Sequence, residues 1–208
     1  MDDAHQVPES ADQRDLWEKF YREQKRPWRG VGKLEGLEIE HGARVLDIGC
    51  GNGKTSSALI NMGASVIGLD FSSSAVEYCR SMFGAAAEFV VADCESMPFP
   101  DKSFDAVAAV HIFEHLNSDE AERTVSEIRR VLVPGGKVFI RVFAVGDLRA
   151  KGKDSDVKGN GISYRYYTED QMSSLFSGFE VISSKRIDET ARFGAVRVKL
   201  ESAFKLPE

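Results

Sequence analysis

A glycine-rich turn directly after an apolar run constrains this chain more than any other feature. The segment VLDIGCGNG runs from Val45 to Gly53 and repeats glycine at every second position through Gly49 and Gly51. Glycine permits backbone conformations closed to other residues and lets the main chain approach a ligand closely. The residues before the turn suit a buried strand, and those after it suit a helix whose free amides favour a carboxylate or phosphate. The segment therefore predicts a strand, a ligand-binding turn and a helix.

Three kinds of nucleotide-binding turn are similar to this segment, and the spacing separates them. The phosphate loop G-x-x-x-x-G-K-[ST] would need a glycine at Ile48, although Gly53, Lys54 and Thr55 match its end. The dinucleotide pattern G-x-G-x-x-G would need a small residue at Lys54, which makes an NAD-dependent oxidoreductase a distant alternative. The string D-x-G-x-G-x-G, which begins at Asp47, is the best match.

This string resembles the first motif of class I S-adenosylmethionine (SAM) dependent methyltransferases. Later segments resemble the second, third and fourth strands of that family in the same order: 65–70 (SVIGLD), 89–93 (FVVAD) and 104–110 (FDAVAAV). Residues 127–140 (EIRRVLVPGGKVFI) resemble the family's next helix, its Pro-Gly-Gly turn and its fifth strand. Two of these strands end in an acid, and Asp70 lies about 20 residues after the glycines, where ribose-binding folds place a carboxylate. The order and spacing together favour a methyltransferase domain.

The resemblance implies SAM as the cofactor and assigns its contacts. Asp70 would accept both ribose hydroxyls, and Phe71 would lie near the adenine, whose edge Asp93 and the amide of Cys94 would meet. The glycine turn would receive the carboxylate of the methionine part. The full set of implied cofactor residues is Asp47, Gly49, Cys50, Gly51, Gly53, Asp70, Phe71, Ser72, Asp93, Cys94 and Val110.

The order of elements predicts an α/β fold in a single domain over residues 1–208. We expect strands at 43–48, 65–70, 88–92, 104–110, 136–144, 179–188 and 192–201, and helices at 53–62, 73–83, 118–132 and 168–177. Alternation of this kind gives a doubly wound, Rossmann-like and mostly parallel sheet, which the resemblance extends to seven strands. The last two strands, joined near residues 189–191, should form an antiparallel C-terminal hairpin.

Three segments lie outside this regular pattern. Residues 1–12 are polar and we expect them to be disordered, whereas 13–35 should form an N-terminal helical lid. Trp17, Tyr21 and Trp28 are its candidate substrate or lid residues, and simple packing against the core is the alternative. Residues 145–163 are rich in glycine, lysine and aspartate and are expected to be a mobile loop that gates the site.

His111, Glu114 and His115 form an H-x-x-E-H string at the end of the fourth strand. It matches a zinc protease signature literally, but that signature needs an established helix and a third ligand. It is also similar to the metal-binding E-x-x-E-H of ubiquinone O-methyltransferases and small-RNA 2′-O-methyltransferases, except that His111 replaces the first glutamate. We therefore expect no metal, and take both histidines as candidate general bases, with plain helix-start packing as the alternative.

Composition limits the partners. A net charge of −6 disfavours a duplex nucleic acid, and no apolar run suggests a membrane span, so we expect a cytoplasmic protein. The three cysteines lack zinc-site spacing. The prediction is methyl transfer to an O, S or C nucleophile of a small molecule; an RNA methyltransferase or a non-catalytic SAM-binding partner subunit is the alternative. Four cations on the terminal strands could attract an anionic acceptor or simply be solvated: Arg186, Arg192, Arg197 and Lys199.

Overall fold

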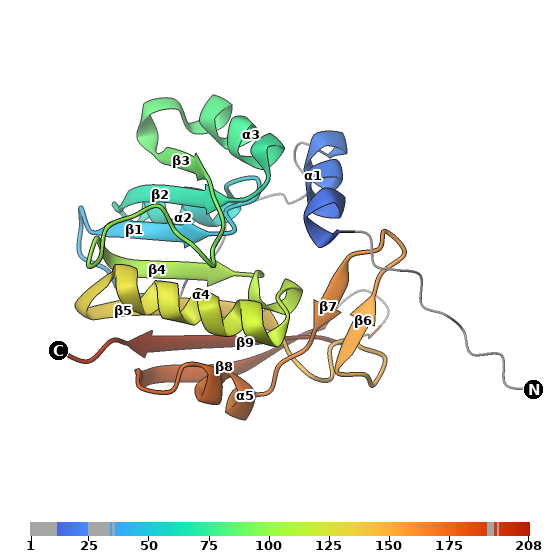
Figure 1. Cartoon of the computed structure of the whole chain (residues 1–208). Helices are drawn as coiled ribbons and strands as arrows, with labels where there is room; N and C mark the ends of the chain where they lie inside the picture. Colours follow the sequence, from blue (N-terminus) through green and yellow to red (C-terminus); the bar gives the residue numbers. More distant parts are fainter. Residues whose placement is uncertain (1–11, 25–33, 35, 191–193, 195) are drawn as a thin grey trace, which may run out of the picture.

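The computed structural model describes residues 12–24, 34, 36–190, 194 and 196–208. Of the residues 1–12 that were expected to be disordered, only Asp12 is described, and it caps the first helix. Most of the second half of the expected lid lies outside the described residues, Trp28 included, and so does Arg192. The chain forms a seven-stranded sheet with the strand order β3-β2-β1-β4-β5-β9-β8 (Figure 1). Its strands are β1 (Arg44–Ile48), β2 (Ser65–Asp70), β3 (Glu88–Val91), β4 (Phe104–Val110), β5 (Leu132–Phe143), β8 (Glu180–Thr190) and β9 (Val196–Lys205).

Strand directions agree with the expected α/β fold. The pairs β1–β2, β1–β4, β2–β3 and β4–β5 are parallel, whereas β9 runs antiparallel to both β5 and β8. The mostly parallel, Rossmann-like sheet with an antiparallel C-terminal hairpin is thereby confirmed. The carboxyl ends of β1, β2 and β4 meet at one edge, where ligands of such sheets bind.

Helices flank this sheet, and α1 lies beside its carboxyl edge (Figure 1). They are α1 (Gln13–Glu23), α2 (Lys54–Asn61), α3 (Ser73–Phe83), α4 (Ser118–Val131) and α5 (Glu169–Leu175), with short 3₁₀ turns η1 (Gly84–Ala86) and η2 (Phe113–His115). A separate antiparallel ribbon consists of β6 (Ser155–Val157) and β7 (Ser163–Arg165). Figure 1 shows α1 beside α3, with the ribbon at the same end of the sheet.

The central strands are buried on both faces because their side chains alternate. On one face, Val45 of β1 packs in a cluster with Leu59 of α2. On the other face, Leu46 and Ile48 of β1 pack in a cluster with Ile128 of α4. Successive side chains of a strand point to opposite faces of the sheet. A parallel strand that is covered by helices on both faces therefore needs apolar residues in succession.

Several elements differ from those expected. The fifth strand begins at Leu132 rather than at residue 136, because Leu132 already pairs with Phe104. The last strand occupies 196–205 rather than 192–201, because pairing with β5 extends to Lys205 opposite Lys137 and buries Phe204. The segment 145–163 is not a plain loop, since β6 pairs with β7 there. Within the described residues, no helix is long and apolar enough to span a bilayer.

Gly53 gives a test of the turn that precedes α2. Its φ is 77°, and a Cβ there would meet the Phe83 ring at 2.3 Å. Gly53→Ala should therefore lower the free energy of unfolding by roughly 2–4 kcal/mol, from backbone strain plus overpacking. Gly42→Ala is the matched control, because its φ is 83° but no atom lies within 4 Å. Urea denaturation that gives equal losses for both variants would contradict the packing contribution of Phe83.

Candidate active site

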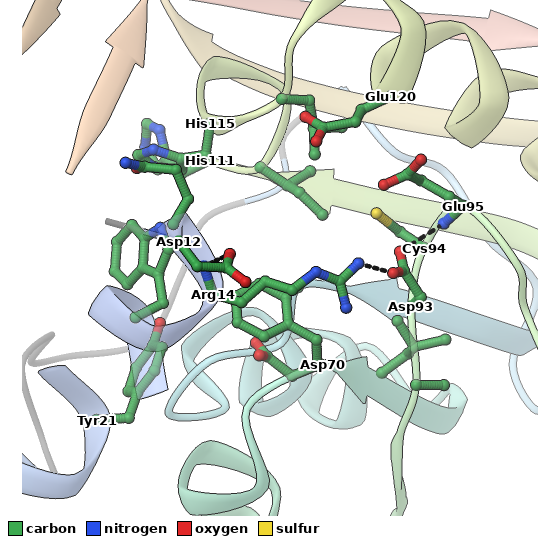
Figure 2. Close-up of a pocket in the computed structure, with 18 residues that line it drawn as sticks. Asp12, Arg14, Tyr21, Asp70, Asp93, Cys94, Glu95, His111, His115 and Glu120 are labelled. Carbon is green, nitrogen blue, oxygen red and sulfur yellow. Dashed lines mark hydrogen bonds and ion pairs between the residues drawn. The ribbon is translucent and has the colours of Figure 1, made fainter. Parts of the chain in front are cut away.

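Two adjoining cavities open at the carboxyl edge of the sheet. The first, here the acidic cavity, is lined by Asp12, Gln13, Arg14, Trp17, Tyr21, Gly49, Leu69, Asp70, Phe71, Ala92, Asp93, Cys94, Glu95, His111, Ile112, His115, Leu116 and Glu120 (Figure 2). The second, here the basic cavity, is lined by Trp17, Tyr21, Gly49, Cys50, Gly51, Asn52, Lys54, Thr55, Val110, His111, His115, Arg141, Phe143, Leu148, Arg149, Lys151, Asp156, Val157, Lys158, Gly159, Tyr164, Arg197 and Lys199. Each cavity brings together segments far apart in the sequence.

Asp70 joins the glycine turn to the end of β2. The amide of Gly51 donates to its Oδ2 and the amide of Ser72 donates to its Oδ1, both at 2.9 Å. Each carboxylate oxygen can accept a further hydrogen bond, so the residue is suited to a vicinal diol. Burial raises the pKa of Asp70 to about 6, although the two backbone amides oppose the rise.

Three of the implied cofactor residues do not line either cavity. Asp47 is buried behind the turn, where the hydroxyl of Ser56 donates to its Oδ2 at 2.6 Å. Burial raises the pKa of Asp47 to about 7. Gly53 caps α2, and the Ser72 hydroxyl caps α3 by accepting from the amide of Ala75. These residues therefore shape the turn and the helix starts, and their contact with the cofactor stays a prediction.

The far end of the acidic cavity is closed by Arg14 of α1. Its guanidinium forms an ion pair with Asp93 and lies 5.5 Å from the ring centroid of Phe71 (Figure 2). A ligand that meets Asp93 and Phe71 would have to displace this guanidinium. Nearby, burial raises the pKa of Cys94 to about 11, which keeps the thiol neutral.

The helix α1 covers the junction of the two cavities. Trp17 and Tyr21 line both of them, with ring centroids 5.8 Å apart. Glu18 fastens the helix to the start of α3, because its carboxylate accepts from the hydroxyls of Ser72 and Ser74. The helix thus lies against the site from one side, and its role as a lid stays a prediction.

The two histidines also line both cavities. His111 has a φ of 60°, which is unusual for a residue with a side chain, and its Nδ1 lies 2.7 Å from Oε1 of the fully buried Glu114. His115 places Nδ1 2.9 Å from the carbonyl oxygen of Ser163. A carbonyl only accepts, so His115 carries its proton on Nδ1 and Nε2 is an acceptor. Burial lowers the pKa of His115 and favours the neutral ring.

The basic cavity holds residues that the sequence pattern did not single out. Lys54, Arg141, Arg149, Lys151 and Lys158 line it beside Arg197 and Lys199, the two terminal-strand cations that were expected to attract an anion. Arg186 instead pairs with Asp188 outside the cavity. The five cations that the sequence analysis did not assign to this site lie on four different segments of the chain, and no local sequence motif connects them.

Comparison with known proteins agrees with this geometry. Residues 46–140 match the family described as a methyltransferase domain. The chain is 34% identical over 172 residues to a sterol 24-C-methyltransferase of Gibberella zeae and 31% identical over 162 residues to a probable tRNA methyltransferase 9B of Bos taurus. The alignments cover 74% and 76% of this chain and 44% and 34% of those relatives. A crystal structure of a SAM-dependent methyltransferase from Methanosarcina mazei superposes with a TM-score of 0.74 at 24% identity, covering 86% of this chain and 100% of that one.

The chain contains a class I SAM-dependent methyltransferase domain, and the methyl donor of this family is SAM. This confirms the SAM interpretation of the glycine turn over the dinucleotide and phosphate-loop alternatives. The chain spans about a third to a half of the length of the curated relatives named above. The acceptor and the whole protein's activity are therefore matters for proposal.

The buried Asp47 generates a prediction about stability and pH. Burial raises its pKa from the ordinary value of 3.8 to about 7. Between these two pH values the carboxyl of Asp47 therefore keeps a proton in the folded protein that it loses in the unfolded chain. Stability of the ligand-free protein should fall as pH rises from about 4 to about 7. Asp47→Asn should remove this cost and raise the free energy of unfolding at pH 8 by roughly 1–4 kcal/mol, measured by urea denaturation.

The pH dependence separates this effect from that of Asp70, which titrates near pH 6. Between pH 6 and 7 the wild-type protein should lose stability more steeply than Asp47→Asn, in which Asp70 alone of these two acids still gives up its extra proton. Asp188→Asn, at an exposed side chain, is the control and should behave as wild type. An Asp47→Asn variant less stable than wild type at pH 8 would show that the charged carboxylate stabilises the fold.

Proposed function

We propose that the protein transfers the methyl group of SAM to an oxygen, sulfur or carbon nucleophile of a small-molecule acceptor. One observation supports this most directly. The acidic and basic cavities share Trp17, Tyr21, Gly49, His111 and His115, so a donor in one and an acceptor in the other meet beside the histidines. Holding two reactants in line can supply roughly 7–11 kcal/mol of the activation free energy.

The residues of the acidic cavity fit the donor. Asp70 is proposed to accept from the ribose hydroxyls, and Phe71 and Asp93 to hold the adenine once Arg14 swings aside. The glycine turn faces the carboxylate of the methionine part at the start of α2. The bound donor supplies an electrophilic methyl: the acceptor's electron pair forms the new bond to it, and the carbon–sulfur pair stays on sulfur, giving S-adenosylhomocysteine.

His111 is proposed as the general base for a protonated acceptor. The Glu114 carboxylate accepts from Nδ1, which leaves Nε2 free to take the acceptor's proton and stabilises the imidazolium that forms. The neutral His115, held by Ser163, is proposed to orient the acceptor through its own Nε2. The positive φ of His111 is a strained conformation of the kind found at functional positions.

The tRNA methyltransferase relative keeps RNA as the second acceptor class. A net charge of −6 argues against an extended phosphate-binding face. The non-catalytic alternative, a SAM-binding partner subunit, predicts cofactor binding without turnover. Incubation with labelled SAM and either a metabolite mixture or bulk tRNA tests all three: label in a small molecule supports the proposal, label in tRNA replaces it, and none in either contradicts a catalytic role.

Asp70→Asn tests the donor site. The amide replaces one acceptor oxygen by a donor, so calorimetric affinity for SAM and S-adenosylhomocysteine should weaken by roughly 1–3 kcal/mol. For the wild type, affinity should rise as pH increases through about 6. Asp70 has a pKa of about 6, so it loses its proton in this range and becomes the carboxylate that accepts from the ribose hydroxyls. Asp101→Asn, an exposed acid, is the control. Wild-type affinity in Asp70→Asn would contradict the ribose assignment.

His111→Asn tests the base, because asparagine tolerates the left-handed backbone of this position. When the acceptor reacts through a hydroxyl or a thiol, the kcat of the variant should be about 10²- to 10⁴-fold lower than that of the wild type. Its affinity for S-adenosylhomocysteine should change little. His41→Asn, at an exposed histidine on the amino side of β1, is the control. If the variant loses cofactor binding instead, the imidazole belongs to the donor site.

A further inference from the structure

The basic cavity contains more positive charge than its neighbours neutralise. Of its seven lysines and arginines, three form ion pairs with carboxylates: Arg141 with Glu201, Lys158 with Asp156, and Lys199 with Glu189. The other four make no ion pair within the described part of the chain: Lys54, Arg149, Lys151 and Arg197. Asp156, already paired, is the one carboxylate among the described lining residues.

Two of these unpaired cations lie on one aromatic ring. The guanidinium carbon of Arg149 is 4.2 Å from the ring centroid of Phe143, and that of Arg197 is 5.9 Å from it. The Nε of Arg197 is buried and has no hydrogen-bond partner among the described residues. A buried donor without a partner is costly unless a ligand satisfies it.

Phe143 also connects this pair of arginines to the proposed chemistry. Its ring stacks on that of His111, with centroids 4.4 Å apart and planes at 29°. The Phe143 ring is therefore a common neighbour of both guanidinium groups and of the imidazole. A group held by the arginines would place the next few atoms of the same molecule beside His111 and His115.

The cations also repel one another. Burial, followed by the charges of Lys199, Arg141 and Arg197, lowers the pKa of Lys54. Burial and then Arg197 lower the pKa of Arg149. Like charges held together in a partly buried site disfavour one another, and a bound anion would relieve that repulsion.

We propose that the acceptor is a small organic anion whose carboxylate or phosphate binds Arg149 and Arg197 in the basic cavity. Guanidinium groups bind such oxyanions with paired, charge-assisted hydrogen bonds. The ribbon residues Val157 and Tyr164 and Trp17 of α1 line the same cavity, so apolar surface for the rest of the acceptor adjoins the cations. This inference rests on the proposed methyl transfer, since it names the acceptor class of that site.

The experiment measures ligand binding to the full chain saturated with S-adenosylhomocysteine, at constant ionic strength. Benzoate and phenyl phosphate are the anionic probes, and benzyl alcohol is the neutral probe of similar size. At least one anion should bind tenfold or more tightly than benzyl alcohol, and whichever binds tighter identifies the oxyanion. Equal binding of all three would overturn the inference.

Variants then locate the site. Arg149→Gln, Arg197→Gln and the double variant should weaken binding of the preferred anion, the double variant by at least tenfold. Arg186→Gln is the matched control, because Arg186 pairs with Asp188 and lies outside the cavity. Undiminished anion binding in the double variant would overturn the inference.

The same titrations separate this inference from the proposed function. Affinity for S-adenosylhomocysteine should be unchanged in every variant, which also shows that each has folded. Efficient methylation of a neutral acceptor would support the proposed methyl transfer but contradict the inference that the acceptor is an anion. Tight binding of a short single-stranded RNA that weakens steeply with salt and is lost in the double variant would assign the same cations to RNA phosphates and overturn the inference.

Discussion

The hydrogen bond from the amide of Gly51 to the carboxylate of Asp70 holds the site together. It connects the turn after β1 to the end of β2, two strands already paired in parallel through five residues. The turn can take this path because Gly51 has a φ of 53°, and a side chain there would collide with the hydroxyl of Tyr21. The same small turn therefore fixes Asp70, the proposed ribose acceptor, and lies against Tyr21 of α1.

The distribution of charge separates the two halves of the site. The net charge of −6 is an average that hides a cavity with seven cations beside one with five acids. The cations come from the start of α2, from β5, from the segment that follows it and from β9, which the sheet order brings to one edge. Charge that is scattered along the sequence is thus concentrated beside the histidines, where it can select an acceptor.

Much of the donor site was predictable from sequence because its residues are local to strand ends. In a parallel sheet, the carboxyl ends of neighbouring strands converge on one edge, so Asp70, Asp93 and His111 had to meet there once the strands were assigned. The sequence did not show where the side chain of Asp47 lies. It belongs to the buried strand itself, and its side chain points behind the turn to Ser56.

The sequence by itself determined the α/β class, the SAM-binding turn and the order of the acids, because period-2 apolar runs and glycine spacing are local properties. Only the tertiary structure decided that Arg14 lies on Phe71 and that Glu114 holds His111. It alone also placed Arg149 and Arg197 against the Phe143 ring. Such contacts depend on how α1, β9 and the β6–β7 ribbon pack over the sheet edge, and packing between distant segments leaves no periodic signal in the chain.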